Sequence, residues 1–287
     1  MIINEEEIQI YLKQYVDDTN WRVYSPQRGF SHGKSFIGIS SRQKVFIKLG
    51  VDNRVLQLLS NSNITPHYLV GGIFKATRVA IQEYVEVKHP DRMWYSQNMK
   101  TLASLFHTLQ SLTSLHHYIS DLKNEDYQKL FVHYVSQIKY EYNKALLYQK
   151  ERDIIKSLID LYDERILCIS GKGLVPSHGD VNSGNILIAP TTTYLVDWET
   201  LHFSDPIRDI AHILWWMYPR SQWGPLLTQF HINLMDKAQR ERFYLSVSTR
   251  ALYVYLLFVN AGREHGRRFL LDAQLSASYN QPYKLLE

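Results

Sequence analysis

The spacing of apolar residues changes along this chain, and that change restricts its fold more than any other feature. The first ~85 residues contain short β-favouring runs bounded by turn residues, whereas the sequence from Asn98 onward follows helical periodicity. Strands grouped before helices predict an α+β protein. We expect a small lobe with an antiparallel sheet and one helix, residues 1–86, followed by a larger, mainly helical lobe, residues 87–287.

The small lobe contains five predicted strands, at 21–24, 35–39, 44–48, 68–74 and 78–84. Turn residues at 40–43 and 74–77 predict hairpins, so neighbouring strands should pair antiparallel. One helix is expected around residues 52–60, because Val55, Leu56 and Leu59 lie on one face at helical spacing.

The larger lobe begins with a strong helical signal. Apolar residues follow the i, i+3, i+4 pattern over several turns, at Leu102, Leu105, Phe106, Leu109, Leu112 and Leu115. Further helices are predicted at 126–149, 151–169, 205–217, 236–261 and 262–279. Residues 175–196 interrupt them with two short apolar runs between turn residues, which predicts a hairpin within the helical part.

Composition restricts the class of protein. A net charge of +4 without a basic run gives no reason to expect nucleic-acid binding. Cys168 is the single cysteine, so an intramolecular disulfide is impossible and a reducing compartment fits. The longest apolar stretch, 251–259, is too short to span a bilayer, and the acidic N-terminus does not resemble a secretory signal. We therefore expect a cytoplasmic, soluble protein without a membrane partner. No oligomeric state is indicated.

The predicted hairpin carries the residues that indicate chemistry. Its sequence begins His178-Gly179-Asp180, continues to Asn185, and reaches Asp197 directly after an apolar run. The spacing of Asp180 and Asn185 matches the kinase pattern H-x-D-x-x-x-x-N. A hairpin would bring Asn185 and Asp197 to the same end, and two hard oxygen donors suit Mg²⁺. Any one of these residues alone would more often cap a turn or end a strand.

This segment, with Val196-Asp197-Trp198-Glu199, resembles the catalytic and metal loops of the aminoglycoside phosphotransferase and choline kinase superfamily, whose fold is protein-kinase-like. The sequences Asp205-Pro206 and Asp209-Ile210-Ala211 match its next element, and Leu102–His107 is similar to one of its helices. The resemblance implies that Asp180 is the catalytic base and that Asn185 and Asp197 bind Mg²⁺. It further implies that Asp209 braces the catalytic loop and that His178 has a structural role.

The same resemblance places a site for ATP or GTP in the small lobe. Lys48, at the end of a predicted strand, fits the lysine that contacts nucleotide phosphates, and Asp52 is its expected carboxylate partner. Backbone groups around Glu83 and Val85 would meet the base. Gly29, Ser31 and Gly33 would belong to a loop covering the phosphates. Gly33-Lys34-Ser35 resembles part of a Walker A loop, but residue 28 is Arg where that motif requires glycine.

The acceptor site is expected beyond Asp209, where aromatic residues cluster. The candidates are Trp215, Trp216, Tyr218 and Trp223, together with Glu199. Aromatic rings suit a quaternary ammonium or a sugar, although rings at this spacing more often fill a core. Lys and Arg outnumber Asp and Glu after Thr200, which weakens the case for a polycationic antibiotic.

The resemblance implies an enzyme that moves the γ-phosphate of ATP to a hydroxyl of a small molecule, such as an aminoglycoside-like antibiotic, an amino alcohol or a sugar-like metabolite. Two alternatives remain. One is an inactive nucleotide-binding scaffold, which the intact set of Lys48, Asp180, Asn185 and Asp197 opposes. The other is a protein kinase, but Trp198-Glu199 stands where D-F-G would require Phe-Gly.

Overall fold

The computed structural model describes residues 3–16, 20–26, 35–86, 88–119, 126–263 and 266–279. It contains two compact units. The sheet unit consists of Met1–Pro90, Leu112–Tyr118 and Ser183–Glu199, and the helical unit consists of Asp91–Ser111, Ile119–Asn182 and Thr200–Glu287. As a division into functional lobes, the boundary between residues 86 and 87 stays a prediction.

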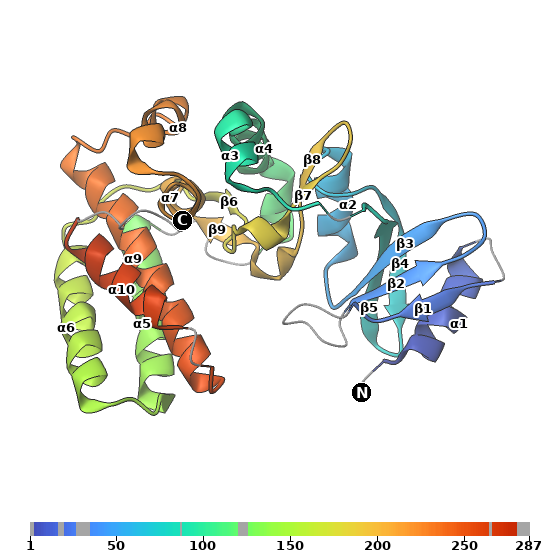
Figure 1. Ribbon diagram of the computed structural model, residues 1–287, viewed down its shortest axis with the longest axis horizontal. Coiled ribbons are helices and arrows are strands. Elements are labelled where there is room, and N and C mark those ends of the chain that lie inside the picture. The colour runs from blue at the N-terminus through green and yellow to red at the C-terminus, as the bar shows by residue number, and fades with distance from the viewer. Residues whose placement is uncertain are drawn as a thin grey trace. The chain divides into compact units, whose positions relative to one another are not determined.

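The sheet unit is built on a five-stranded antiparallel sheet (Figure 1) with the order β1-β2-β3-β5-β4. Its strands are β1 (Arg22–Tyr24), β2 (Ser35–Ile39), β3 (Lys44–Leu49), β4 (Tyr68–Phe74) and β5 (Thr77–Glu83). Both predicted hairpin turns are present, since Ile39 pairs with Lys44 and Phe74 pairs with Thr77. The α+β fold class is confirmed.

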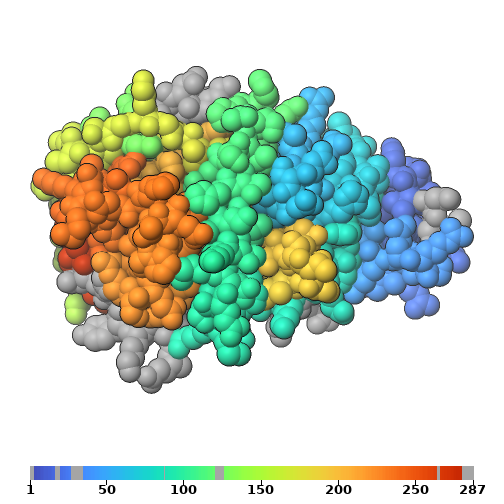
Figure 2. Space-filling view, turned by 90° about the horizontal axis from the view of Figure 1, so that it is seen from above, coloured from blue at the N-terminus to red at the C-terminus, as the bar shows by residue number. Residues whose placement is uncertain are grey.

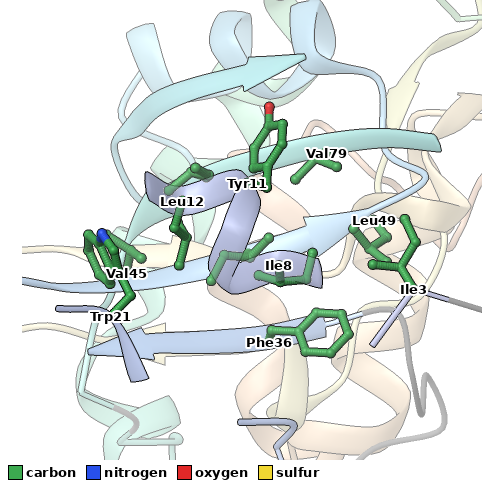
Figure 3. Packing of buried hydrophobic residues seen from close by; sticks show 11 residues of the cluster. Ile3, Ile8, Tyr11, Leu12, Trp21, Phe36, Val45, Leu49 and Val79 are labelled. Carbon is green, nitrogen blue, oxygen red and sulfur yellow. The ribbon is translucent and has the colours of Figure 1, made fainter. Parts of the chain in front are cut away.

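Helix α1 (Glu5–Tyr15) was not predicted, although its sequence carries a start signal. The side chain of Asn4 accepts a hydrogen bond from the Glu7 backbone, and the Glu7 side chain accepts one from the Asn4 backbone, which forms a capping box. Ile8, Tyr11 and Leu12 then fall on one face and pack on the sheet with Trp21, Phe36, Val45 and Val79 (Figure 3). This cluster is the hydrophobic core of the sheet unit.

The sheet unit also contains α2 (Asn53–Asn61), close to its predicted position, a 3₁₀ turn (Thr113–His117), and a hairpin of β7 (Ile186–Ile188) and β8 (Thr193–Leu195). The hairpin is attached through its backbone: Leu195 N–H donates to Ile64 C=O at 2.8 Å, and Ile188 N–H donates to Lys88 C=O at 2.9 Å. Figure 2 shows part of this hairpin in gold at the surface, beside blue segments of the same unit. These contacts therefore group the hairpin with the sheet, despite its place in the sequence.

The helical unit contains eight helices among its described residues: α3 (Arg92–Gln97), α4 (Met99–Ser111), α5 (Tyr127–Lys144), α6 (Gln149–Ile166), α7 (Ile207–Met217), α8 (Trp223–Gln229), α9 (Lys237–Asn260) and α10 (Arg267–Ala277). Helix α9 is the central one, because it packs against α5, α7 and α10 (Figure 1). A short antiparallel pair, β6 (Val175–Ser177) and β9 (His202–Ser204), flanks the segment that contains Asp180.

Helix α4 ends at Ser111, four residues before the predicted Leu115. Near its end, the hydroxyl of Thr108 donates to Ser104 C=O and that of Ser111 donates to Thr108 C=O. Side-chain bonds of this kind compete with the helical backbone ladder. The chain continues as the 3₁₀ turn, which still buries Leu115.

Candidate functional site

In the sheet unit, Lys48 lies between two carboxylates. Its ammonium is 2.6 Å from Asp197 Oδ1 and 2.6 Å from Glu199 Oε1. Lys48 belongs to strand β3, and the neighbouring strands hold its backbone from both sides, because it pairs with Ser35 of β2 and with Ala80 of β5. Burial alone lowers the pKa of Lys48, but the hydrogen bonds to the two carboxylates outweigh burial and raise that pKa. The lysine is therefore a fixed positive charge.

Asp52 is not the partner of Lys48, and the prediction of that ion pair is wrong. The Asp52 carboxylate caps α2 by accepting from Arg54 N–H at 2.9 Å, and it lies 2.9 Å from the Arg78 guanidinium. An N-cap carboxylate points along its own helix axis toward free backbone N–H groups. The position of Asp52 directly before α2 therefore indicated that it would cap this helix.

Asn185 and Asp197 stand at the same end of the β7–β8 hairpin. Ile186 pairs with Leu195, and Val196 N–H donates to Asn185 C=O at 3.0 Å. Asp197 has φ 71°, a left-handed conformation that Asp and Asn tolerate better than most residues. Trp198 fixes the following turn, because its indole N–H donates to Thr65 Oγ1 at 3.2 Å.

The donor set at this end of the hairpin fits Mg²⁺. It consists of one amide oxygen and one carboxylate, which are hard ligands, beside an ammonium suited to phosphate. Mg²⁺ commonly takes one or two protein side chains and completes its shell with phosphate oxygens and water. Asn185 and Asp197 would be the residues that hold it.

The predicted base-binding segment follows β5. Glu83 is tied to its own unit, since its carboxylate accepts from His67 N–H at 3.0 Å and from Tyr194 O–H at 3.3 Å. Its backbone N–H donates to His67 C=O. The expected contact of Glu83 and Val85 with a nucleotide base stays a prediction. Gly29, Ser31 and Gly33 lie outside the described residues.

In the helical unit, Asp209 holds the backbone that leads to Asp180. One carboxylate oxygen accepts from His178 N–H at 2.7 Å and the other from Gly179 N–H at 3.1 Å. His178 is fully buried, and its carbonyl accepts from the Thr200 hydroxyl at 2.8 Å. These three hydrogen bonds, two to Asp209 and one from Thr200, fix the backbone of the loop.

Gly179 is required by the local geometry. It has φ 78°, and a Cβ there would lie 2.6 Å from Thr200 O and 2.7 Å from His202 Cε1. Because the first of these atoms belongs to the backbone, a side chain would force the loop apart. The loop can therefore approach β9 only with glycine at this position.

The Asp180 carboxylate contacts Arg250, which the sequence analysis missed. Arg250 Nη2 lies 2.5 Å from Asp180 Oδ1, and the two side chains are 15% and 37% exposed. A signal was present: Arg250 is the only charged residue between Arg242 and Arg263 in the sequence. A charge inside a buried helix face requires a partner.

Three of the four predicted acceptor rings belong to the core. Trp215, Tyr218 and Trp223 are at most 1% exposed, which corrects the expectation that they line an acceptor site. Their polar atoms are used internally: Trp215 donates to Asp272, Tyr218 to Tyr95 C=O and Trp223 to Tyr218 C=O. Half-buried Trp216 also donates to Asp272, at 3.1 Å. Glu199, expected to face an acceptor, contacts Lys48 instead.

Solved structures resemble this fold over nearly its whole length. Choline kinase LicA from Streptococcus pneumoniae aligns with a TM-score of 0.70 and 14% identity, over 96% of this chain and 99% of that one. A thermostable mutant of aminoglycoside phosphotransferase APH(4)-Ia, in a ternary complex with AMP-PNP and hygromycin B, gives a TM-score of 0.72 and 11% identity, over 95% and 98%. Spectinomycin phosphotransferase APH(9)-Ia, with ADP and spectinomycin, gives 0.65 and 15%, over 98% and 96%. The fold is therefore kinase-like.

Sequence comparison gives a more specific result. No curated protein sequence matches the chain. Across the described residues, each helix is too short or too polar to cross a membrane. The sequence model of the phosphotransferase enzyme family matches residues 52–243, which include α2, the β4–β5 hairpin, the Asp180 loop and the Asn185–Asp197 hairpin. This chain therefore belongs to the phosphotransferase enzyme family.

Proposed function

We propose that this protein is a small-molecule kinase that transfers the γ-phosphate of ATP or GTP to a hydroxyl of a small acceptor in the cytoplasm. The contact of Lys48 with Asp197, at the hairpin end that also carries Asn185, is the observation that carries this proposal. It joins a phosphate-binding cation to metal-binding oxygens. The solved relatives that contain AMP-PNP or ADP support a nucleotide as the donor.

The residues of the sheet unit would bind the nucleotide. Lys48 would contact the α- and β-phosphates, for which its raised pKa keeps it charged. Asn185 and Asp197 would hold Mg²⁺, which when bound neutralises charge on the phosphates. Phosphate oxygens would then contact the Lys48 ammonium in place of some of the carboxylate oxygens of Asp197 and Glu199.

Asp180 would act on the acceptor. As the acceptor oxygen bonds to the γ-phosphorus, the bond from that phosphorus to the bridging oxygen breaks, and the nucleoside diphosphate leaves. The hydroxyl proton passes to Asp180. Asp209 and Gly179 serve this step by holding the loop backbone, so that the carboxylate does not need to be ordered during the reaction.

The test is Mg²⁺-dependent consumption of nucleotide with a panel of hydroxyl compounds, for the wild type and for Asp180→Asn. This replacement keeps the size of the side chain and removes its charge. Turnover should fall by about two or more orders of magnitude, while nucleotide affinity and melting temperature change little. A wild type that binds nucleotide but never transfers phosphate would indicate a scaffold. A variant that keeps more than about a tenth of the rate would remove Asp180 from the role of base.

A further inference from the structure

The ion pair between Arg250 and Asp180 opposes the proposed role of Asp180. Arg250 Nη2 lies 2.5 Å from Asp180 Oδ1, so this oxygen accepts from a guanidinium where the proposed base would have to accept from the hydroxyl of the acceptor. Arg250 comes from the middle of α9, and its side chain is 15% exposed, so it is held largely within the unit. An arginine fixed against a general base suggests that it has another partner during catalysis.

A second arginine lies in the same region. Arg208 of α7 is 6% exposed, and its Cζ stands 3.7 Å from the centroid of the Tyr134 ring. Its Nε and Nη1 atoms have no hydrogen-bond partner among the residues that the structure describes. Buried donors of this kind are rare and require an explanation. Burial lowers the pKa of Arg208, and the charge of Arg250 acts in the same direction.

The effect of both arginines reaches a buried histidine between α7 and α9. His212 lies 3.2 Å, through Nε2, from Ser246 C=O of α9. Burial lowers the pKa of His212 first, and the charges of Arg208 and Arg250 lower it further. The interior between these two helices therefore disfavours an additional positive charge.

The neighbouring carboxylates have structural partners. Asp205 lies 3.3 Å from Arg242 and accepts from the backbone N–H of Ile207, the first residue of α7. Asp209 accepts from the two backbone N–H groups of the loop. Among the described residues, Arg208 forms no ion pair with a carboxylate, although the charges of Asp209 and Asp205 act on it, and the carboxylate that contacts Arg250 is that of the proposed base.

We infer that the acceptor carries an anionic oxygen group, a carboxylate or a phosphate ester, which binds Arg250 in place of Asp180. This inference rests on the proposed function. A planar guanidinium binds such groups through two parallel N–H···O bonds, so it would both anchor the acceptor and orient it. Arg208 adds favourable potential from the interior. Neutral and cationic acceptors cannot release Asp180 in this way.

The exchange of partners also gives Arg250 a protective role. Without acceptor, Arg250 keeps Asp180 from activating water. When the anion of the acceptor takes Arg250, Asp180 becomes available beside the hydroxyl of the same molecule. The wasteful hydrolysis of nucleotide by water is thereby suppressed until the acceptor is bound.

The experiment uses two matched series that differ in charge. One comprises glycerate, glycerol 3-phosphate, glycerol and 3-amino-1,2-propanediol, and the other comprises glucuronate, glucose 6-phosphate, glucose and glucosamine. We expect kcat/KM for an acidic member to exceed that of its neutral and cationic analogues by about tenfold or more. Comparing the carboxylates (glycerate and glucuronate) with the phosphate esters (glycerol 3-phosphate and glucose 6-phosphate) identifies which anion is preferred.

Arg250→Gln removes the charge, Arg250→Lys keeps it without the planar fork, and Lys237→Gln removes a charge from an exposed position of the same helix. Arg250→Gln should abolish the preference for acids and raise nucleotide hydrolysis in the absence of acceptor. Arg250→Lys should retain part of the preference, and Lys237→Gln should behave as wild type. A merely structural arginine would not raise this hydrolysis.

The same acids are titrated by calorimetry into the wild type with AMP-PNP. If no acid binds, or if neutral or cationic analogues are preferred, the inference is overturned, even when phosphate is transferred. If Arg250→Gln changes neither the preference nor the hydrolysis, it is also overturned. If acids bind through Arg250 but no phosphate is transferred, the anion site stands and the proposed kinase function fails.

Discussion

The ammonium of Lys48 lies 2.6 Å from the carboxylate of Asp197, although 149 positions separate these residues in the sequence. Glu199 makes a second contact with the same nitrogen. Burial is the main cause that raises the pKa of Glu199, followed by its hydrogen bond with Asp197, and Lys48 opposes both. Two carboxylates can remain this close because one cation lies between them.

Replacing Lys48 tests whether this cation also serves the nucleotide. Lys48→Met keeps much of the apolar stem and removes the charge. We expect nucleotide affinity, turnover or both to fall by about tenfold or more, because the phosphates lose a buried charge partner. Calorimetric titration of ATP measures the affinity. Lys13→Met, at an exposed position of α1, is the control with the same change in net charge. Equal behaviour of the two variants would mean that Lys48 only neutralises Asp197 and Glu199.

Asp197→Asn tests the metal site without disturbing the backbone, since Asn also tolerates the left-handed conformation at φ 71°. A neutral amide is a poorer ligand for Mg²⁺ than a carboxylate. Turnover should decrease by about two orders of magnitude, and the Mg²⁺ concentration at half-maximal rate should increase. Wild-type activity should vanish with a chelator and return with Mg²⁺. Undiminished turnover in the variant would rule out this metal assignment.

His202 should make the protein sensitive to acid. Burial lowers the pKa of His202 to about 4, from an ordinary 6.5, and the charges of Arg208 and Arg250 act in the same direction, against Asp209. Neutral His202 also fits its partners, Thr200 C=O at 2.7 Å and the Tyr134 hydroxyl at 2.9 Å. Between pH 6.5 and 4 the unfolded chain binds more protons at this residue, so the free energy of unfolding falls as pH decreases through this range.

Urea unfolding at several pH values between 7 and 4 measures this effect. His202→Gln keeps a donor and an acceptor but does not titrate, so its free energy of unfolding should decrease less over the same range. His212, whose pKa is also lowered, remains in both proteins and accounts for part of the decrease. Parallel pH profiles for the two proteins would contradict the prediction.

Asp272 supports the aromatic core of the helical unit. Its two carboxylate oxygens accept from the indoles of Trp215 and Trp216, each at 3.1 Å. Asp272→Ala leaves the buried indole N–H of Trp215 without its acceptor, which should lower the free energy of unfolding by about 1–3 kcal/mol. Denaturant unfolding measures it. Asp272→Asn, which keeps one accepting oxygen, should lose less. If Asp272→Ala instead raised only the KM for an acceptor, these indoles would belong to a binding site.

The sequence by itself determined the local features of this protein. Strand β2 was predicted with its observed bounds, because β-favouring residues and the turns that bound them act over a few residues. A hairpin that brings Asn185 and Asp197 to the same end was also predicted, from two short apolar runs between turn residues. Even α1 was available to prediction, since its capping box lies within Asn4–Glu7.

Only the tertiary structure decided the partners of these residues. Asp52 and Asp197 are both carboxylates near predicted element ends, yet one caps a helix and the other holds Lys48. Arg250 meets Asp180 across 70 positions, and Trp215 of α7 is buried because Tyr244 of α9 and Asp272 of α10 contact it. The pattern of a helix shows which residues share a face. It does not show what covers that face, because that depends on how distant segments pack.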